Sequence, residues 1–254
     1  MILTIDGKTI PAQEGETILD VAKKAQIPIP TLCYKPWAEA QGGCRLCSVE
    51  ITRQNWDGWK KVVTSCNHPA QDGLIVYTNT ERIVKLRKTL LDLLLARCPH
   101  TPEIQKMAKE YGISKTSFIE RKEPDDCILC GLCVKACEAI GANAISTIQR
   151  GIEKRIDTPY SQPNEACIGC ASCAEVCPTH HIKYQESEGI RHIWKRDFPM
   201  VKCSQCGRTI ITQAQKEHLI QKTHLSASYF DKCEICHKKE TAEQFYKLQN
   251  MNHL

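Results

Sequence analysis

Aromatic residues and long apolar runs are scarce in this sequence. Phe, Trp and Tyr make up 6% of its 254 residues. The most apolar stretch, residues 90–96, is interrupted by Asp92, whereas a membrane-spanning helix needs about 20 consecutive apolar residues. The N-terminal residues also lack the basic segment, apolar core and cleavage site of a secretory signal. We therefore expect a cytoplasmic protein without a membrane span.

Motifs for two-electron or bond-making chemistry are also missing. The chain has no G-x-G-x-x-G fingerprint, P-loop, Ser-His-Asp order or flavin motif. Its formal net charge is +5, but this value counts every thiol as neutral. Metal centres held by thiolates would each add about −2. The basic charge is therefore no reason to expect nucleic acid binding.

Cysteine, by contrast, is abundant, with 17 residues. Disulfides are rare in a reducing compartment, where cysteines at short fixed spacings indicate metal ligands. All of them except Cys98 fall into four complete quartets along the chain. The cysteines therefore predict metal centres, and their spacing predicts which ones.

Two central runs share the spacing C-x2-C-x2-C-x3-C, which is typical of bacterial ferredoxins with two cubane clusters. In that pattern the fourth cysteine of each run binds the cluster of the other run. One 4Fe-4S cluster is expected on Cys127, Cys130, Cys133 and Cys177, and the other on Cys167, Cys170, Cys173 and Cys137. Pro178 completes the pattern, whereas Glu138 departs from it. Zinc or disulfides are the alternatives.

A quartet near the N-terminus has the spacing C-x10-C-x2-C-x18-C. It consists of Cys33, Cys44, Cys47 and Cys66, and it keeps the central C-x2-C of a plant-type 2Fe-2S site. Residues 3–11 predict a hairpin that turns at Asp6-Gly7, and residues 17–26 predict a helix. A second hairpin over residues 48–65 would turn at Asp57-Gly58. This order predicts a β-grasp domain with a 2Fe-2S cluster, with zinc as the alternative.

Residues 78–97 form the clearest predicted helix. Thr78 and Glu81 resemble a capping box, and Pro99 follows the end. The predicted buried face consists of Ile83, Leu86, Leu90, Leu93 and Leu94. A second amphipathic helix is expected over residues 102–111.

The C-terminal segment differs in composition from the rest. A basic, polar connection around residues 191–196 leads to two C-x2-C pairs, which are Cys203, Cys206, Cys233 and Cys236. Such pairs are typical of a zinc ribbon or treble clef; rubredoxin-type iron or another cluster is the alternative. Because four thiolates complete a zinc site, His218, His224 and His237 are expected to be solvated.

Together these patterns predict an α+β chain of four parts. They are a β-grasp 2Fe-2S domain at 1–77, a helical linker at 78–120, a double 4Fe-4S ferredoxin domain at 121–190 and a zinc-binding module at 200–254. The expected cofactors are one 2Fe-2S cluster, two 4Fe-4S clusters and one zinc ion.

This order resembles the N-terminal portion of the largest iron-sulfur subunit of respiratory complex I. It is also similar to the diaphorase iron-sulfur subunit of NAD-linked hydrogenases and to the catalytic subunit of electron-bifurcating hydrogenases, over about residues 1–185. In those families the helix leads to one His and three Cys that hold an additional cluster. Here only Cys98 and His100 stand in that stretch, so that cluster is expected to be absent.

The resemblance implies a non-catalytic electron-transfer subunit of a cytoplasmic, NAD(P)H-linked oxidoreductase complex. Its implied partners are a flavin and iron-sulfur subunit that oxidises NAD(P)H, ferredoxin, and a terminal subunit of transhydrogenase, formate dehydrogenase or hydrogenase type. Electron bifurcation among these couples is also implied. A stand-alone polyferredoxin carrier and a redox sensor are the alternatives.

Overall fold

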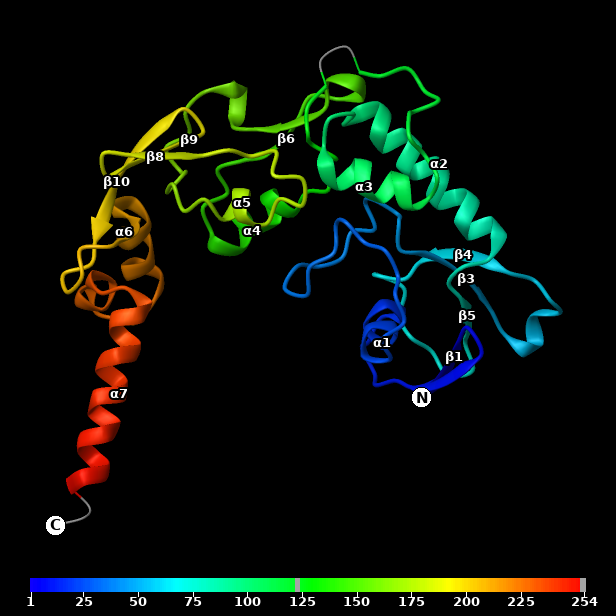
Figure 1. The fold of residues 1–254 in the computed structure, drawn as a ribbon, viewed down its shortest axis with the longest axis horizontal. Helices are drawn as coiled ribbons and strands as arrows, with labels where there is room; N and C mark the ends of the chain where they lie inside the picture. The colour runs from blue at the N-terminus through cyan, green and yellow to red at the C-terminus, as the bar shows by residue number, and fades with distance from the viewer. Residues whose placement is uncertain (122–123, 252–254) are drawn as a thin grey trace. The chain divides into compact units, whose positions relative to one another are not determined.

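The structure, a computed structural model, describes residues 1–121 and 124–251 (Figure 1). The chain forms two compact units, and each is discontinuous in sequence. Unit 1 contains the described residues of Met1–Ala136 together with Gln149–Ile156 and Val176–His181. Unit 2 contains Cys137–Ile148, Asp157–Glu175 and the described residues from Ile182 onward. No helix in the described part of the chain is long and apolar enough to cross a membrane.

Unit 1 begins with a five-stranded mixed sheet in the order β2-β1-β5-β3-β4. Its strands are β1 (Ile2–Ile5), β2 (Lys8–Pro11), β3 (Ser48–Thr52), β4 (Lys61–Thr64) and β5 (Ile75–Tyr77). Strand β1 pairs parallel to β5, and the other pairs are antiparallel. Both predicted hairpins are confirmed, because β1 pairs with β2 and β3 pairs with β4.

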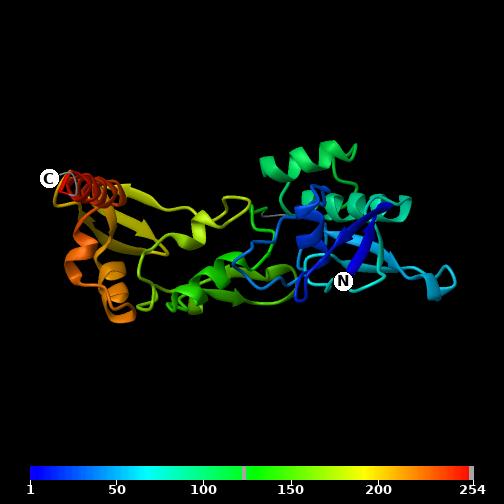
Figure 2. The same ribbon diagram turned by 90° about the horizontal axis from the view of Figure 1, so that it is seen from below.

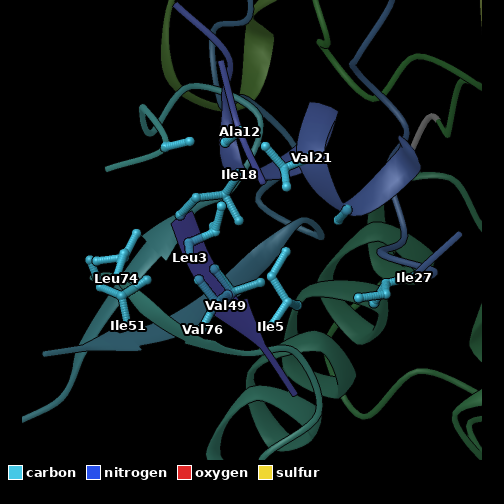
Figure 3. Close-up of a cluster of buried hydrophobic side chains, with 12 residues drawn as sticks. Leu3, Ile5, Ala12, Ile18, Val21, Ile27, Val49, Ile51, Leu74 and Val76 are labelled. Atoms are coloured by element: carbon cyan, nitrogen blue, oxygen red, sulfur yellow. The ribbon is translucent and has the colours of Figure 1, made fainter. Parts of the chain in front are cut away.

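Helix α1 (Ile18–Lys24) packs its apolar side on this sheet and confirms the predicted helix. The side chain of Thr17 caps its N-terminus in a capping box with Asp20. Figure 3 shows the resulting core, in which Ile18 and Val21 meet Leu3, Val49 and Val76. This core fixes the ends of the strands from which the cysteine loops leave.

Helix α2 (Glu81–Arg97) confirms the predicted long helix but begins differently. Its N-cap is Thr80, whose hydroxyl accepts a hydrogen bond from the backbone N–H of Ile83. Thr78 instead donates from its hydroxyl to Asp6, at 2.5 Å. The predicted cap at Thr78 is wrong because a carboxylate distant in sequence holds that side chain.

The buried face of α2 is also shifted from the prediction. Its fully or nearly fully buried positions are Ile83, Arg87, Leu91, Leu95 and Ala96. Leu86, Leu90 and Leu94 lie half-buried beside them, and Leu93 is 47% exposed. The predicted face is therefore wrong at Leu93, and Arg87 occupies a core position that the pattern did not assign.

Helix α3 (Pro102–Glu110) confirms the second predicted helix and lies beside α2 (Figure 2). The two helices share a core cluster with Leu46, Cys98 and Ile104. Half-buried Cys44 and Ile128 pack against the same cluster. The helices thus join the loops of two cysteine quartets through one apolar core within unit 1.

The remaining elements carry or follow the central cysteine runs. Helices α4 (Leu132–Ile140) and α5 (Ser172–Glu175) each begin inside a run, and strands β6 (Ser146–Ile148) and β7 (Arg155–Asp157) lie between the runs.

Unit 2 contains a four-stranded antiparallel sheet in the order β11-β10-β9-β8. Its strands are β8 (Gln185–Ser187), β9 (Ile190–Ile193), β10 (Arg196–Lys202) and β11 (Thr209–Thr212). Helices α6 (Gln213–Lys222) and α7 (Glu234–Met251) follow. The expected polar connection at 191–196 is wrong, because these residues belong to a β9–β10 hairpin.

Candidate iron-sulfur and zinc centres

The N-terminal quartet gathers on loops that leave the five-stranded sheet. Cys33 follows α1, Cys44 and Cys47 precede β3, and Cys66 follows β4. Cys33, Cys47 and Cys66 are buried and Cys44 is half-buried. The backbone N–H of Cys44 donates to Cys33 Sγ at 3.3 Å. The fold therefore brings all four predicted 2Fe-2S ligands toward one place.

Hydrogen bonds between thiols shift the acidity of this quartet. The thiol of Cys33 lowers the pKa of Cys44 to about 6, and the thiol of Cys66 lowers the pKa of Cys47 to about 7. The same bonds, together with burial, raise the pKa of Cys33 and Cys66. One thiolate in each pair forms first, and a bound cation must displace the other proton because only thiolates coordinate metals.

Arg87 places a buried cation directly behind this quartet. Its side chain is fully buried, and it donates to the carbonyl oxygens of Leu46 and Ser48, both at 2.9 Å. A third bond, at 3.0 Å, reaches the side chain of Asn79. Among the described residues no carboxylate lies within 4.0 Å of it.

A buried charge normally has a charged partner. Leu46 and Ser48 flank Cys47, so the guanidinium lies beside the backbone that carries a thiol of the quartet. An anionic centre on the four thiolates would supply the missing counter-charge. The residues present therefore fit a negatively charged cluster at this position.

The first central quartet lies within unit 1. Cys127, Cys130 and Cys133 belong to the same unit as the distant Cys177. Electrostatic interaction with Cys177 raises the pKa of both Cys127 and Cys130, after the larger effect of burial, and Cys130 reaches about 11. Cys177 Sγ accepts the backbone N–H of His181 at 3.3 Å. The described geometry therefore brings Cys177 near Cys127 and Cys130, from the other sequence run, and all four residues belong to unit 1.

The second central quartet lies within unit 2. Cys137, Cys167, Cys170 and Cys173 line one cavity, which Trp194 also borders. Burial is the largest cause that raises the pKa of Cys173 to about 12, and the neighbouring thiols add to it. The backbone N–H of Ala144 donates to Cys137 Sγ at 3.2 Å. Cys137 thus shares a cavity with the other sequence run, as the crossed pattern requires.

The N-terminal and first central quartets lie close together inside unit 1. A Cβ built on Gly131 would lie 3.3 Å from the side-chain oxygen of Gln41. The charge of Cys44 also contributes to the raised pKa of Cys130. Gly131 has a φ of +76°, a conformation open to glycine, and its missing side chain lets the two loops meet. The loops that carry these two quartets therefore approach one another closely.

The C-terminal quartet is the most compact group of potential ligands. The Sγ atoms of Cys203, Cys206, Cys233 and Cys236 all lie within 4.8 Å of one another. The first pair occupies the turn between β10 and β11, and the second stands at the start of α7. The backbone N–H of Cys233 donates to Cys203 Sγ at 3.3 Å and lowers the pKa of Cys203 to about 6. Four sulfurs so gathered suit a tetrahedral thiophilic ion.

Other singled-out residues have structural partners. Cys98 is fully buried in the core beside α3, whereas His100 is exposed. His224 is exposed as expected. The expectation of solvated rings is wrong for two histidines: His218 bonds the carbonyl of Ile140, and His237 stacks on Tyr229.

Known families match two parts of the chain. Residues 1–81 match the family described as 2Fe-2S iron-sulfur cluster binding domain. Residues 121–184 match the family described as 4Fe-4S dicluster domain. Both matches confirm the types of cluster domain that the cysteine spacing predicted, in the predicted order.

Relatives include iron-sulfur subunits of larger enzymes. The NADPH-Fe(3+) oxidoreductase subunit alpha of Geobacter sulfurreducens is 35% identical over 201 residues, covering 70% of this chain and 23% of that protein. The NAD-reducing hydrogenase HoxS subunit gamma of Cupriavidus necator is 32% identical over 201 residues, covering 66% of this chain and 83% of that subunit. This chain therefore spans about a quarter of the first relative but most of the second.

A solved structure agrees with the sequence relatives. A chain in the crystal structure of an NAD+-reducing [NiFe]-hydrogenase in the H2-reduced state aligns with a TM-score of 0.55 and 33% sequence identity. The alignment covers 62% of this chain and 74% of the hydrogenase chain.

Proposed function

This chain belongs to the family of iron-sulfur subunits that includes the NAD-reducing hydrogenase HoxS subunit gamma, and from that premise we propose that it relays single electrons inside an NAD(P)H-linked oxidoreductase complex. The observation that carries the proposal is the contact between the Gln41 and Gly131 loops, which joins two cysteine quartets in one unit. The third quartet, which belongs to unit 2, would be a further centre of the relay.

The proposed ligands are the predicted ones. Cys33, Cys44, Cys47 and Cys66 would hold a 2Fe-2S cluster. Cys127, Cys130, Cys133 and Cys177 would hold one 4Fe-4S cluster, and Cys167, Cys170, Cys173 and Cys137 the other. Cys203, Cys206, Cys233 and Cys236 would hold zinc. When bound, the clusters supply one-electron redox couples, whereas zinc supplies only structure because it has no accessible redox change.

The residues of the chain control the conditions of the transfer. Most of the proposed cluster ligands are buried, and keeping water from them reduces the reorganisation that accompanies each change of charge. Arg87 holds the loop of Cys47 and places positive charge behind it. The chain itself carries no motif for hydride chemistry, so a flavin and iron-sulfur subunit would oxidise NAD(P)H. Ferredoxin or a terminal catalytic subunit would exchange electrons with another cluster of the chain. If the complex exchanges electrons with NAD(P)H, ferredoxin and a terminal subunit, the exchange would be a bifurcation.

Native purification tests this function. Anaerobic purification of the chain from its source should recover a flavin-containing, NAD(P)H-oxidising partner, because a relay without catalytic residues needs one. Metal analysis should give about ten Fe and about one Zn per chain, from one 2Fe-2S, two 4Fe-4S and one zinc site.

The outcomes of that purification separate the candidates. A monomer with full iron and no partner would favour a stand-alone carrier. About fourteen Fe would mean that a further 4Fe-4S cluster exists, and about six would mean that a central quartet is misassigned.

The crossed assignment has its own test in Cys137→Ser. This change should perturb the cluster held by Cys167, Cys170 and Cys173, because Cys137 lines their cavity. Electron paramagnetic resonance of the reduced full chain, with the cubane signals resolved, would detect the change. Cys98→Ala serves as the control, since it removes a thiol outside the quartets without placing a hydroxyl in the apolar core, and it should leave all signals unchanged. A loss confined to the cluster of Cys127 would contradict the crossed assignment.

A further inference from the structure

The β9–β10 hairpin contacts the cysteine loop of the second quartet at several points. The hairpin lies beyond residue 184, where the match to the dicluster family ends. At its turn, Trp194 donates from its indole N–H to Cys173 Sγ at 3.4 Å. Trp194 also borders the cavity that the four thiols line. A side chain outside the matched domain thus bonds a proposed cluster ligand directly.

Arginine side chains of the same hairpin bind the backbone of that loop. Arg196 donates from one guanidinium nitrogen to the carbonyls of Asn164, Glu165 and Cys167, at 2.7, 3.0 and 2.9 Å. Arg191 is buried, donates to the carbonyl of Gly169 at 2.8 Å and forms an ion pair with Glu186 at 2.6 Å. Two guanidinium groups therefore stand against the loop that carries Cys167 and Cys170.

Close packing fixes the hairpin in this position. A Cβ built on Gly169 would lie only 2.5 Å from the ring of Phe198, which belongs to β10. Gly169 has a φ of +66°, so glycine suits both its backbone and the contact. Phe198 is buried, and Arg196 lies over its ring with 4.9 Å between guanidinium and centroid. The hydrogen bonds to the cysteine loop are thus held by a packed aromatic contact.

The first central quartet has different surroundings in unit 1. There the backbone N–H of Cys127 donates to the carboxylate of Asp125 at 2.9 Å. Arg97 donates to the carbonyl of Cys127, but it also lies 3.9 Å from that carboxylate. Arg121 pairs with Asp125 as well, at 2.8 Å. The first loop therefore has a carboxylate bonded to the N–H of Cys127 and shared by two arginines. The second loop has an indole N–H and Arg196, for which no carboxylate within 4.0 Å is found among the described residues.

Hydrogen bonds to sulfur and nearby positive charge favour the reduced, more negative form of a cluster and raise its potential. We propose that the β9–β10 hairpin raises the reduction potential of the 4Fe-4S cluster on Cys167, Cys170, Cys173 and Cys137 above that of the other cubane. In this transfer the cluster of Cys127 would lose one electron and become oxidised, and the cluster of Cys173 would gain that electron and become reduced. No bond forms or breaks. The inference rests on the cluster assignment of the proposed function.

A redox titration of the full chain tests the hairpin. The signal that disappears in Cys170→Ser identifies the cluster of the second quartet. In the wild type, this cluster should have the higher midpoint potential of the two cubanes. Trp194→Phe and Arg196→Gln should each lower that midpoint by an amount equal to about a tenfold change in the electron-transfer equilibrium, or 59 mV for one electron. The other cubane should keep its midpoint. Arg196→Lys, which retains the charge, should restore part of the loss.

Lys195→Gln is the matched control. Lys195 is exposed in the same turn and bonds the carbonyl of Ser161, outside the cysteine loop, so its removal should leave both midpoints unchanged. Iron analysis of each variant distinguishes a failed cluster assignment from a failed hairpin effect. Unchanged midpoints in Trp194→Phe and Arg196→Gln at full iron content would overturn the inference. So would equal shifts of both cubanes, or a wild-type midpoint lower at the Cys170 cluster.

Discussion

Replacing Arg87 with methionine is expected to destabilise the 2Fe-2S domain by about 2–6 kcal/mol, the cost of leaving two buried acceptors without a donor. Methionine keeps much of the apolar stem but leaves the carbonyls of Leu46 and Ser48 buried without their donor. Each unsatisfied acceptor costs about 1–3 kcal/mol. Because those carbonyls flank Cys47, the cluster should be lost at a lower urea concentration. Visible circular dichroism of the holoprotein would follow this loss.

Two further variants separate the role of charge from that of geometry. Lys88→Met removes a neighbouring exposed cation on the same helix and should change stability by less than about 0.5 kcal/mol. Arg87→Lys keeps the charge but loses the planar set of donors, so its midpoint should fall between those of the wild type and Arg87→Met. If Arg87→Met lost its cluster at the same urea concentration as Lys88→Met, the buried cation would not support the site.

The cysteine spacing predicted the cluster types because the ligands of one site stand a few residues apart. The same local logic worked for the turn at Asp6-Gly7 and for helix α1, where Thr17 and Asp20 form a capping box three residues apart. The cap of α2 failed because Thr78 has its partner at Asp6, 72 residues away. A local pattern cannot distinguish Thr78 from Thr80.

Buried arginines were the main residues that sequence reasoning missed. Arg87 interrupts a leucine-rich helix, and such a charge usually marks the solvent-exposed face. Its acceptors are carbonyls 41 and 39 residues earlier, which no periodicity shows. Arg191 and Arg196 were predicted to lie in a polar connection, because their acceptors are also distant in sequence. Ile190 and Ile193 are instead the first and last residues of strand β9. The sequence does show an arginine near each cysteine run. Only the tertiary contacts show whether that arginine is exposed or binds the backbone of a cysteine loop.

Loss of zinc is expected to unfold the C-terminal module and abolish assembly while the clusters remain. The buried apolar residues of this module are Cys203, Cys233 and Cys236, with half-buried Ile210 packed against them, and Phe230. The metal site is therefore most of the core, and structural zinc contributes about 10–16 kcal/mol in small zinc-binding peptides. Cys236→Ser should remove the ion and leave residues of α6 and α7 open to proteolysis. Deletion of residues 200–254 would be harder to interpret, because it also removes the end of strand β10 (Arg196–Lys202).

The proposed role of this module is to hold the second cubane against a partner subunit. The hydroxyl of Thr212 donates to the carbonyl of Ile168 at 2.6 Å, so the module is tied to the cysteine loop. In Cys236→Ser that bond and the bond from His218 to the carbonyl of Ile140 are lost, at about 1 kcal/mol each, while four thiolates still hold the cluster. Metal analysis should therefore show about ten Fe without zinc, and copurification of the partner should fail. His224→Ala, an exposed change in the same segment, should keep zinc and assembly. Wild-type assembly without zinc would contradict the docking role, and loss of iron would place the module within the ferredoxin fold.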